Sequence, residues 1–473
     1  MLQQSISASR TLNIPAVSPP WVAAVAMFAL TLFAPAVLND GDSFWHLTAG
    51  EWIIAHRAVP HTDPFSYSFA GAPWVAHEWL SEVLMAASFR VAGWSGVVVL
   101  TALAAALAMF QLARHLGRWL PAGANLLLLL LAASCIASNL LARPHILALP
   151  VLEAWVAGLF IARDNGQTPP WRLLPVMCLW ANLHGSFVLG LFLLAPLALE
   201  AALAEPAAWR RVLAHWGGFL LAATAAATLT PHGPAGLLFP FQLMGMTELS
   251  MLTEWQPTYF DTTQPLELVL AAGLYVALTR GARLPPVRLL LLLALLHLSL
   301  HHARHQMLVG VIAPFLVAGP LGAALPAERP GWDGRRWRAG SLAVMAGLTA
   351  LRLLLPVVRV DGITAPVTAL AHVPPALAAQ PVFNDYNYGG YLIYSHIRPL
   401  IDGRADMYGD AFMQRYRLAV MSDKAALEAL LHDYGIRWAI LDRNRPAVGL
   451  LDALPHWCRI YADGMTVVHA ASC

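Results

Sequence analysis

The sequence predicts a mainly α-helical membrane protein: a polytopic helix bundle of about eleven spans, followed by a small external α/β domain. Of its 473 residues, 58% are hydrophobic and only 12% are charged, and the mean hydropathy is +0.59. Apolar runs long enough to cross a bilayer recur up to residue 358, after which they shorten and turn signals appear. This composition excludes an ordinary soluble enzyme, and no nucleic-acid partner is expected.

The membrane domain is predicted to cover residues 21–358. The 173–184 window is too short to cross a bilayer alone, and in the 76–95 stretch Glu78, Glu82 and Arg90 favour an interfacial helix over a crossing. Windows of about 17 to 20 apolar residues give the spans. In chain order they are 21–38, 96–113, 121–139, 146–162, 173–184, 186–203, 212–230, 266–279, 289–303, 306–325 and 340–357.

The distribution of arginine predicts the orientation of the bundle. Thirteen Arg lie in five alternate loops, 114–118, 162–172, 205–211, 280–288 and 328–338. The loops between them hold four, Arg57, Arg90, Arg143 and Arg304. Because basic residues stay on the cytoplasmic side during insertion, the N-terminal segment 1–20 is predicted to be cytoplasmic. An odd number of spans then puts the C-terminal domain, 359–473, on the periplasmic side of a bacterial inner membrane.

The first external loop, 39–95, is the longest between spans and begins with two carboxylates, Asp40 and Asp42. At the membrane boundary, a desolvated carboxylate is suited to act as a general base or to hold a divalent cation, Mg²⁺ or Mn²⁺, against a phosphate. The alternative is structural, with Asp42 capping the next helix and Asp40 ending the span. The sequence leaves both interpretations open.

Other ionisable residues collect near helix ends in the predicted outer loops. Such groups are costly at membrane depth and tend to mark functional sites. The alternative is that outer loops are richer in His because Arg is excluded from them. Their convergence predicts an outward-facing cavity. The residues assigned to this cavity or to an acceptor site are His46, His77, Glu78, His184 and Glu254.

This layout resembles the GT-C superfamily of membrane glycosyltransferases, which use lipid-phosphate-linked sugars. The segment DSFWHLTAGEWIIAHRAVPHTDPFSY, 42–67, resembles the part of oligosaccharyltransferase catalytic subunits that reads Asp-Pro-Tyr-Phe and continues into a basic or His-containing helix. Protein O-mannosyltransferases and lipid A aminoarabinose transferases carry their acid at the same place. The resemblance implies a polyprenyl-phosphate-sugar donor, with Asp42 as the catalytic carboxylate and Asp40 as the second choice.

The second external loop departs from the family pattern. It reads SNLLARPHI, with Arg143 and His145 where the family has another acidic motif. This favours stabilisation of the donor phosphate by cationic side chains over a metal-dependent mechanism, because Arg binds phosphate bidentately and His donates a hydrogen bond. Arg304 and His305 are expected to join them. Glu254, in LTEWQP, matches the family's later-loop glutamate.

The HHARH cluster, 301–305, leaves the metal question open. His301 and His305 lie four residues apart and share one face if the helix continues through them, a spacing that suits a metal. No HExxH motif accompanies them, which favours a contact between Arg304 and a lipid head group. Walker A, GxGxxG and GxSxG motifs are also missing from the sequence, so ATP-driven transport and serine hydrolysis have no support.

The C-terminal segment has alternating patterns typical of an α/β domain. Strands are predicted at 381–395, 398–408, 437–442 and 465–471, and helices at 410–422 and 424–435. In the second strand Asp402, Arg404 and Asp406 would share one face, with Arg404 reaching the donor phosphate. The alternative is a charged turn with an internal Arg–Asp pair.

The segment NDYNYGGYL, within 381–395, loosely resembles the Trp-Trp-Asp-Tyr-Gly segment by which oligosaccharyltransferases recognise acceptor peptides. It keeps Asp385 and Tyr386 but lacks the Trp pair, so peptide specificity is not implied. On this resemblance Asp385 and Tyr386 are assigned to the acceptor site, together with Asp402.

These observations predict an inverting glycosyltransferase that moves a sugar from a polyprenyl-phosphate donor to a glycan, lipid or protein acceptor on the outer face. Two alternatives stay open. One is a transferase of the O-antigen ligase or polymerase type, with a mechanism centred on Arg and His. The other is a non-catalytic transport or assembly protein for lipids or polysaccharides. In the external tail, Cys458 and Cys473 lie in a compartment that permits a disulfide.

Overall fold

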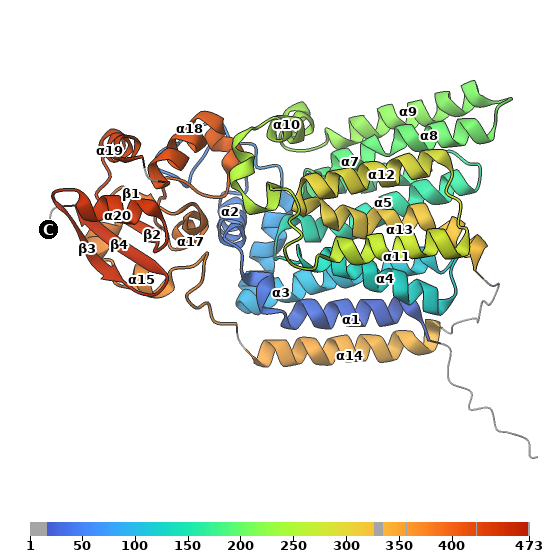
Figure 1. The fold of residues 1–473 in the computed structure, drawn as a ribbon, viewed down its shortest axis with the longest axis horizontal. Coiled ribbons are helices and arrows are strands. Elements are labelled where there is room, and N and C mark those ends of the chain that lie inside the picture. Colours follow the sequence, from blue (N-terminus) through green and yellow to red (C-terminus); the bar gives the residue numbers. More distant parts are fainter. Residues whose placement is uncertain (1–16, 326–333, 356, 422, 472–473) are drawn as a thin grey trace, which may run out of the picture.

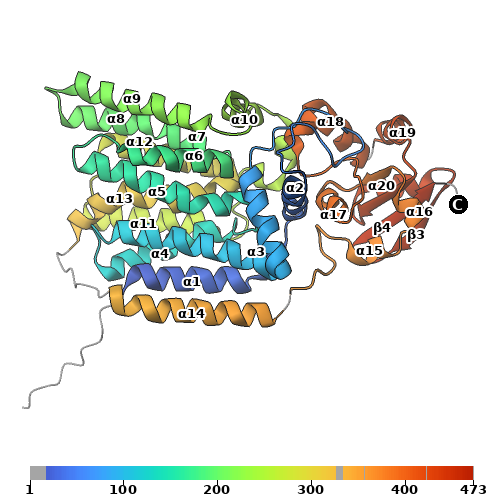
Figure 2. The same cartoon turned by 180° about the vertical axis from the view of Figure 1, so that it is seen from behind.

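The computed structural model describes residues 17–325, 334–355, 357–421 and 423–471. It contains a bundle of helices that run side by side, with a small mixed domain at one end of the bundle (Figures 1 and 2). The predicted fold class is therefore confirmed. The helices of the bundle and its loops are α1 (Pro19–Phe33), α2 (Asp42–His56), α3 (Trp79–Leu116), α4 (Ala122–Ala137), α5 (Pro144–Asp164), α6 (Leu174–Leu183), α7 (Phe187–Phe192), α8 (Leu194–Ala204), α9 (Trp209–Ala227), α10 (Pro234–Met244), α11 (Pro265–Arg280), α12 (Pro286–His301), α13 (Gln306–Ala324) and α14 (Gly334–Leu354).

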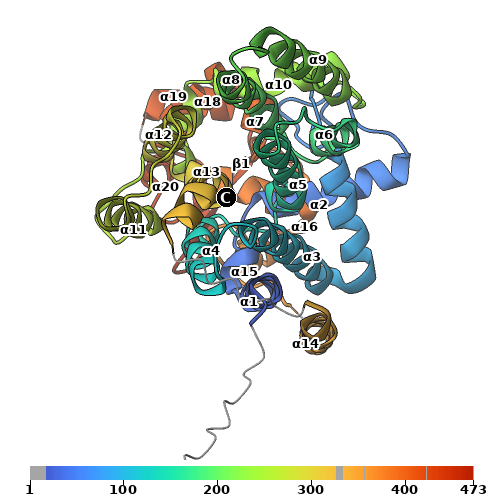
Figure 3. The ribbon, with the colours of Figure 1, turned by 90° about the vertical axis from the view of Figure 1, so that its right-hand side faces the viewer.

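The predicted spans coincide with the helices of the bundle. Within the described residues, four helical segments are long and apolar enough to cross a membrane: Trp79–Leu116, Pro144–Asp164, Phe187–Ala204 and Ala303–Ala324. Shorter apolar helices such as α1, α4 and α12 lie among them (Figure 3). Each of the eleven predicted windows overlaps α1, α3, α4, α5, α6, the α7–α8 pair, α9, α11, α12, α13 or α14. The sidedness of the membrane and the N-terminal segment 1–20, most of which lies outside the described residues, stay predictions.

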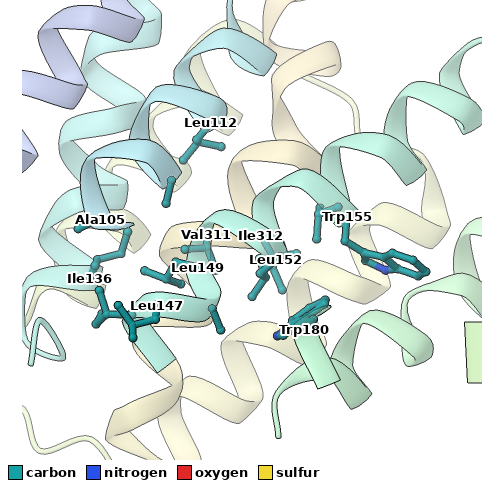
Figure 4. Close-up of a cluster of buried hydrophobic side chains, with 14 of the residues drawn as sticks. Ala105, Leu112, Ile136, Leu147, Leu149, Leu152, Trp155, Trp180, Val311 and Ile312 are labelled. Atoms are coloured by element: carbon teal, nitrogen blue, oxygen red, sulfur yellow. The ribbon is translucent and has the colours of Figure 1, made fainter. Parts of the chain in front are cut away.

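Large and small apolar side chains fill the middle of the bundle. Trp155, on α5, donates a hydrogen bond from its indole nitrogen to the carbonyl of Gly190 at 3.0 Å. A Cβ at Gly190 would lie 2.5 Å from the Trp180 ring, so only glycine lets these helices approach so closely. Figure 4 shows the two Trp residues beside aliphatic side chains of α3, α4, α5 and α13. Close packing of this kind, rather than exclusion of water, holds helices together in lipid.

The first loop connects α1 to α3 through α2 and an irregular segment. The second helix of this loop, α3, begins at Trp79, after a turn at residues 77–78. It continues into the span with a change of direction at Ala92–Gly93, where Gly93 has a φ of 56°. The part before this kink corresponds to the interfacial helix predicted within 76–95.

The C-terminal domain is built on a four-stranded sheet with the order β1-β2-β4-β3. Strand β1 is parallel to β2, and β4 is antiparallel to both β2 and β3. The elements of this domain are α15 (Val367–Ala371), α16 (Pro375–Ala378), β1 (Val382–Asn384), η6 (Tyr386–Tyr388), α17 (Gly389–Tyr394), α18 (Ala405–Val420), α19 (Lys424–Asp433), β2 (Trp438–Asp442), α20 (Pro446–Ala453), β3 (Trp457–Ala462) and β4 (Thr466–Ala471). Five further 3₁₀ turns lie in the bundle and its loops: η1 (Pro35–Leu38), η2 (Trp171–Leu173), η3 (Glu248–Met251), η4 (Thr253–Trp255) and η5 (Ala303–His305).

Four of the six predicted elements of this domain are confirmed, namely the helices α18 and α19 and the strands β2 and β4. The two others are wrong. In 381–395 only the first residues form a strand, and α17 follows; 398–408 is irregular until α18 begins. The glycine pair gives the reason, because a Cβ at Gly390 would lie 2.1 Å from the carbonyl oxygen of Gly41. This segment packs its backbone directly against the start of α2, a tertiary contact that strand propensity does not encode.

The cysteines divide by location. Cys135 and Cys178 are free. Cys458 is disulfide-bonded, and Cys473, its proposed partner, lies outside the described residues.

We predict that Gly50→Ala destabilises the packing of α2 on α3. A Cβ at Gly50 would lie 2.0 Å from the carbonyl oxygen of Glu82 and 2.9 Å from the Ala86 methyl group, so the two helices must separate. Overpacking of this kind costs about 1–3 kcal/mol. The apparent Tm of the purified protein should fall, whereas Gly273→Ala, in the open surroundings of α11, should leave it unchanged or raise it. Equal Tm values for Gly50→Ala and the wild type would contradict the close contact.

Candidate functional site

One guanidinium gathers three carboxylates at the end of the bundle that faces the C-terminal domain. Arg143 immediately precedes α5 and donates from Nε and Nη2 to the two oxygens of Asp40, at 2.5 Å each. Its Nη2 also lies 2.8 Å from Oδ2 of Asp42, and its Nη1 donates to Glu254 at 3.0 Å. Arg304 donates to the other oxygen of Glu254 at 3.0 Å. Four separate segments of the chain therefore meet at this acid cluster.

The carboxylates of the acid cluster differ in pKa. Burial alone would raise the pKa of Glu254, but the charges of Arg304 and Arg143 outweigh burial and lower it to about 2. Burial also raises the pKa of Asp42, to about 6, although Arg143 opposes the shift. Asp40 and Glu254 add to the rise by repulsion. Asp42 is thus the carboxylate of this cluster that is poised to exchange a proton near neutral pH.

The helix-capping alternative for Asp42 does not describe the structure. Asp42 is the first residue of α2, and the preceding cap position is Gly41, with no side-chain cap bond. Oδ1 of Asp42 instead accepts a hydrogen bond from the Trp45 indole at 3.0 Å. A Cβ at Gly403 would lie 1.8 Å from the same oxygen. The C-terminal domain therefore contacts the carboxylate directly and fixes the direction in which it points.

A second polar group surrounds Glu78. Its Oε1 lies 3.3 Å from Nε2 of His184 and 3.6 Å from that of His77, and its Oε2 lies 3.7 Å from Nε2 of His46. The other ring nitrogen of His46 lies 3.3 Å from Glu82. Burial raises the pKa of Glu78 to about 8, lowers that of His77 to about 4 and lowers that of His46 well below its usual value. This Glu78 cluster is therefore neutral near pH 7, a set of donors and acceptors without net charge.

The remaining histidines predicted for phosphate or metal are held by main-chain groups. Nε2 of His145 lies 2.8 Å from the carbonyl of Asn139, and Nδ1 of His305 lies 3.3 Å from the carbonyl of Leu298. Helix α12 ends at His301, so the continuous helix that would align 301 with 305 does not form. Among the described residues, no group of three or more His, Cys, Asp or Glu side chains has the geometry of a metal site.

Arg404 does not reach a donor phosphate, which corrects the prediction. Its side chain is 1% exposed, and its guanidinium lies 4.9 Å from the centre of the Trp74 ring. It donates to both oxygens of Asp402, at 2.8 and 2.6 Å, and to Asp63 at 2.6 Å, while Tyr408 donates to Asp402 at 2.7 Å. The internal Arg–Asp pair is thus what the structure contains, enlarged by Asp63 from the first loop.

The predicted acceptor residues of the C-terminal domain separate into two groups. Asp402 is saturated by Arg404, and Asp385 is buried and accepts from Arg445 at 2.6 Å, so both are structural. Tyr386 is different. Burial, followed by the negative charges of Asp42 and Asp402, raises its pKa well above the usual value, so the phenol is within electrostatic range of the acid cluster.

Sequence reasoning missed several residues that complete the site. Asp63 and Tyr408 saturate the buried cluster around Arg404, and the sequence patterns assigned no role to either. Asp406, which the sequence placed on one face with Asp402 and Arg404 but did not assign to the site, lies close enough to add to the raised pKa of Glu78, and burial raises its own pKa to about 6. The close approach at Gly403 could have been suspected from the sequence, because glycine often occurs where the backbone closely approaches another group.

This bundle, with its long first loop and appended α/β domain, shares its fold with two proteins of known structure. It is similar to an oligosaccharyltransferase, AglB from Archaeoglobus fulgidus, solved with an inhibitory peptide and a dolichol-phosphate: the TM-score is 0.55 at 11% identity, over 89% of this chain and 69% of AglB. It is also similar to ArnT from Cupriavidus metallidurans bound to undecaprenyl phosphate, with a TM-score of 0.53 at 14% identity over 96% and 98% of the two chains. No protein-family profile matches the sequence, and no curated protein does.

We predict that Arg404→Gln destabilises the whole protein. Removal of this guanidinium leaves Asp63 and Asp402 buried without a countercharge, which costs about 3–5 kcal/mol. The apparent Tm should fall by several degrees. Arg415→Gln is the matched control, because Arg415 pairs with Asp433 at the protein surface and should have little effect. An Arg404→Gln variant with the wild-type Tm would show that the ion cluster does not support the fold.

Proposed function

We propose that this chain is a glycosyltransferase that moves a sugar from a polyprenyl-phosphate donor to an acceptor hydroxyl at the outer face of the membrane. The observation that carries the proposal is the acid cluster on Arg143, which offers one carboxylate with a pKa of about 6 beside partly exposed guanidinium groups. A base next to a cationic anion-binding group is what transfer from a lipid phosphate requires. The GT-C fold supports the same class of reaction.

Asp42 is the proposed general base. Its side chain is 22% exposed, with Oδ1 accepting from the Trp45 indole and Oδ2 lying 2.8 Å from Nη2 of Arg143. In the proposed step the acceptor hydroxyl gives its proton to Asp42, and its oxygen forms a bond to the anomeric carbon of the sugar. The bond from that carbon to the phosphate oxygen breaks, and the electron pair leaves with the polyprenyl phosphate. Attack on the face opposite the leaving group inverts the anomeric configuration.

Arg304 is the better candidate for the donor phosphate. Arg143 already donates to Asp40 and Glu254 and forms an ion pair with Asp42, which leaves it little capacity for a ligand. Arg304 makes one bond, through Nη1 to Glu254, and stacks 4.5 Å above the Trp255 ring. Its Nε and Nη2 groups remain for a phosphate, which guanidinium binds bidentately. Arg143 then acts as a positioning residue that aims the acids.

The Glu78 cluster is the proposed contact for the acceptor or the sugar. Because Glu78 and the imidazoles around it are neutral near pH 7, they offer hydrogen bonds to hydroxyl groups without repelling the phosphate. Tyr386 approaches from the C-terminal domain and adds a phenol. The identities of the sugar and acceptor are not part of the proposal.

We further propose that transfer requires no divalent cation. Arg143 lies among Asp40, Asp42 and Glu254, so its guanidinium neutralises the carboxylates that Mg²⁺ or Mn²⁺ would otherwise bind. A fixed side chain thus supplies the positive charge that holds the acids together and limits their repulsion.

Asp42→Asn should abolish transfer from a synthetic polyprenyl-phosphate sugar while the protein folds and inserts normally. The amide keeps the shape of the side chain but does not take the proton from the acceptor hydroxyl, so we expect kcat to fall by a factor of about 10²–10⁴. Transfer is measured with purified protein in detergent or nanodiscs. In the wild type, kcat should rise as pH increases through about 6, because the folded protein raises the pKa of this acid and only the deprotonated form is a base.

Asp261→Asn is the control for this variant, since Asp261 is an exposed acid of another loop at the same end. It should keep wild-type transfer. Undiminished transfer by Asp42→Asn would exclude Asp42 as the base, and donor binding without turnover in the wild type would favour the non-catalytic alternative.

The metal proposal predicts that EDTA leaves transfer by the wild type unchanged, because Arg143 already balances the acids. Activity is measured before and after dialysis against the chelator, with added Mg²⁺ or Mn²⁺ as the comparison. Arg143→Ala should lose most activity without chelation. Loss of wild-type transfer in EDTA, reversed by either ion, would contradict the role given to Arg143.

A further inference from the structure

A pocket lies beside the acid cluster, where α1 and α14 meet the segment that leads into the C-terminal domain. The pocket, of about 590 Å³, is bounded by the turn after α1, by Val98 of α3, by the end of α14 and by residues 357–362. Leu32 and Phe33 form part of its apolar wall. Its two basic residues are Arg352 and Arg359.

Both arginines of this pocket lack a countercharge. Within the described part of the chain, neither forms an ion pair, and the Nε of each is buried without a hydrogen-bond acceptor. Arg352 donates only from Nη2, to the carbonyl of Leu355, and its guanidinium lies 5.8 Å from the Phe33 ring. Arg359 stacks on Phe44, 5.0 Å from the ring centre. Both side chains are partly buried, and a guanidinium nitrogen that is withdrawn from water without an acceptor is costly unless an anion completes it.

The acids near this pocket do not supply that anion. Asp361 lines the pocket, but its carboxylate caps the next helix by accepting from the backbone and side chain of Thr368. Asp40 is held by Arg143. The pocket therefore combines two guanidinium groups that form no ion pair with the described residues, one carboxylate bound by Thr368, and an apolar wall. Its chemical complement is an anion that carries apolar chains.

The position of the pocket points to a lipid from the bilayer. Helix α14 lies at the edge of the bundle, beside α1 (Figure 3). The chain that follows exposes a run of apolar side chains, with Leu354 78% exposed, Val358 74% and Val360 70%. Exposed aliphatic residues next to arginine at a span end are typical of the lipid head-group region.

We propose that this pocket binds the phosphate head group of an anionic membrane glycerophospholipid, with Arg352 and Arg359 as its ligands and the apolar wall against its acyl chains. The bound lipid would join α1, α14 and the segment leading to the C-terminal domain. Asn39 also lines the pocket and directly precedes Asp40 of the acid cluster, so this lipid would help to fix the site without taking part in transfer.

The test uses the full chain in phosphatidylcholine nanodiscs that contain a trace of photoactivatable phosphatidylglycerol. Cross-linked peptides are identified by mass spectrometry. We expect cross-links near residues 32–39 and 357–362, competed by excess phosphatidylglycerol but not by phosphatidylcholine or inorganic phosphate. The R352Q/R359Q variant should lose about tenfold or more of the cross-linked fraction, since each basic residue contributes independently to head-group binding. R338Q, at the other end of α14, should behave as the wild type.

R352K/R359K provides a variant that keeps both charges and should retain most of the cross-linking. If R352Q/R359Q does not fold, the wild-type competition decides: equal competition by phosphatidylcholine overturns the proposal, because the charge of the head group would not matter. Competition by inorganic phosphate at millimolar concentration also overturns it, in favour of a free-phosphate site. Cross-links spread evenly over the outer ends of the helices would show only general lipid contact and would refute a specific pocket.

Discussion

The buried charge of Arg404 determines how the two parts of this protein meet. Its guanidinium binds Asp402 beside it and Asp63 from the first loop of the bundle, and this ion cluster is closed to water. A buried ion cluster is stable only when every charge in it is paired, so the C-terminal domain can pack against the first loop in only one orientation. The neighbouring residue, Gly403, is thereby set against Asp42. The direction of the proposed base thus depends on a contact more than three hundred residues away in sequence.

Arg143 also pairs with several carboxylates, but these lie inside the candidate site. It brings together three carboxylates whose mutual repulsion would otherwise drive them apart. Because it stands closest to Asp40, it lowers the energy of that charge most directly, while burial leaves Asp42 with a raised pKa. The acid cluster therefore contains one acid, Glu254, whose pKa Arg304 and Arg143 lower to about 2, and another, Asp42, whose pKa burial raises to about 6.

The sequence predicted what depends on local composition. Each span was readable because about twenty apolar residues are needed to cross a bilayer, and the order of the spans predicted that Asp42, Arg143 and Glu254 lie at the same end of the bundle. The failures involve tertiary contacts. The sequence of 398–408 alternates like that of a strand, but the segment is irregular where Arg404 is buried. The local sequence does not indicate that Asp63 is the partner of Arg404. Helix α12 ends before His305 for the same kind of reason, since residues 302 and 303 bond to the 255–256 segment.

The scarcity of charge in this chain makes each pairing informative. At the other end of the bundle, Arg288 is buried and paired with both Glu200 and Asp164. At the end that faces the C-terminal domain, Arg304 keeps donors free, and Arg352 and Arg359 form no ion pair with the residues that the structure describes. A protein that buries so few charges does not leave cations unpaired at one end by chance, because each costs free energy in the folded state. The imbalance is explained if anions from outside the chain, carried on lipids, complete that end.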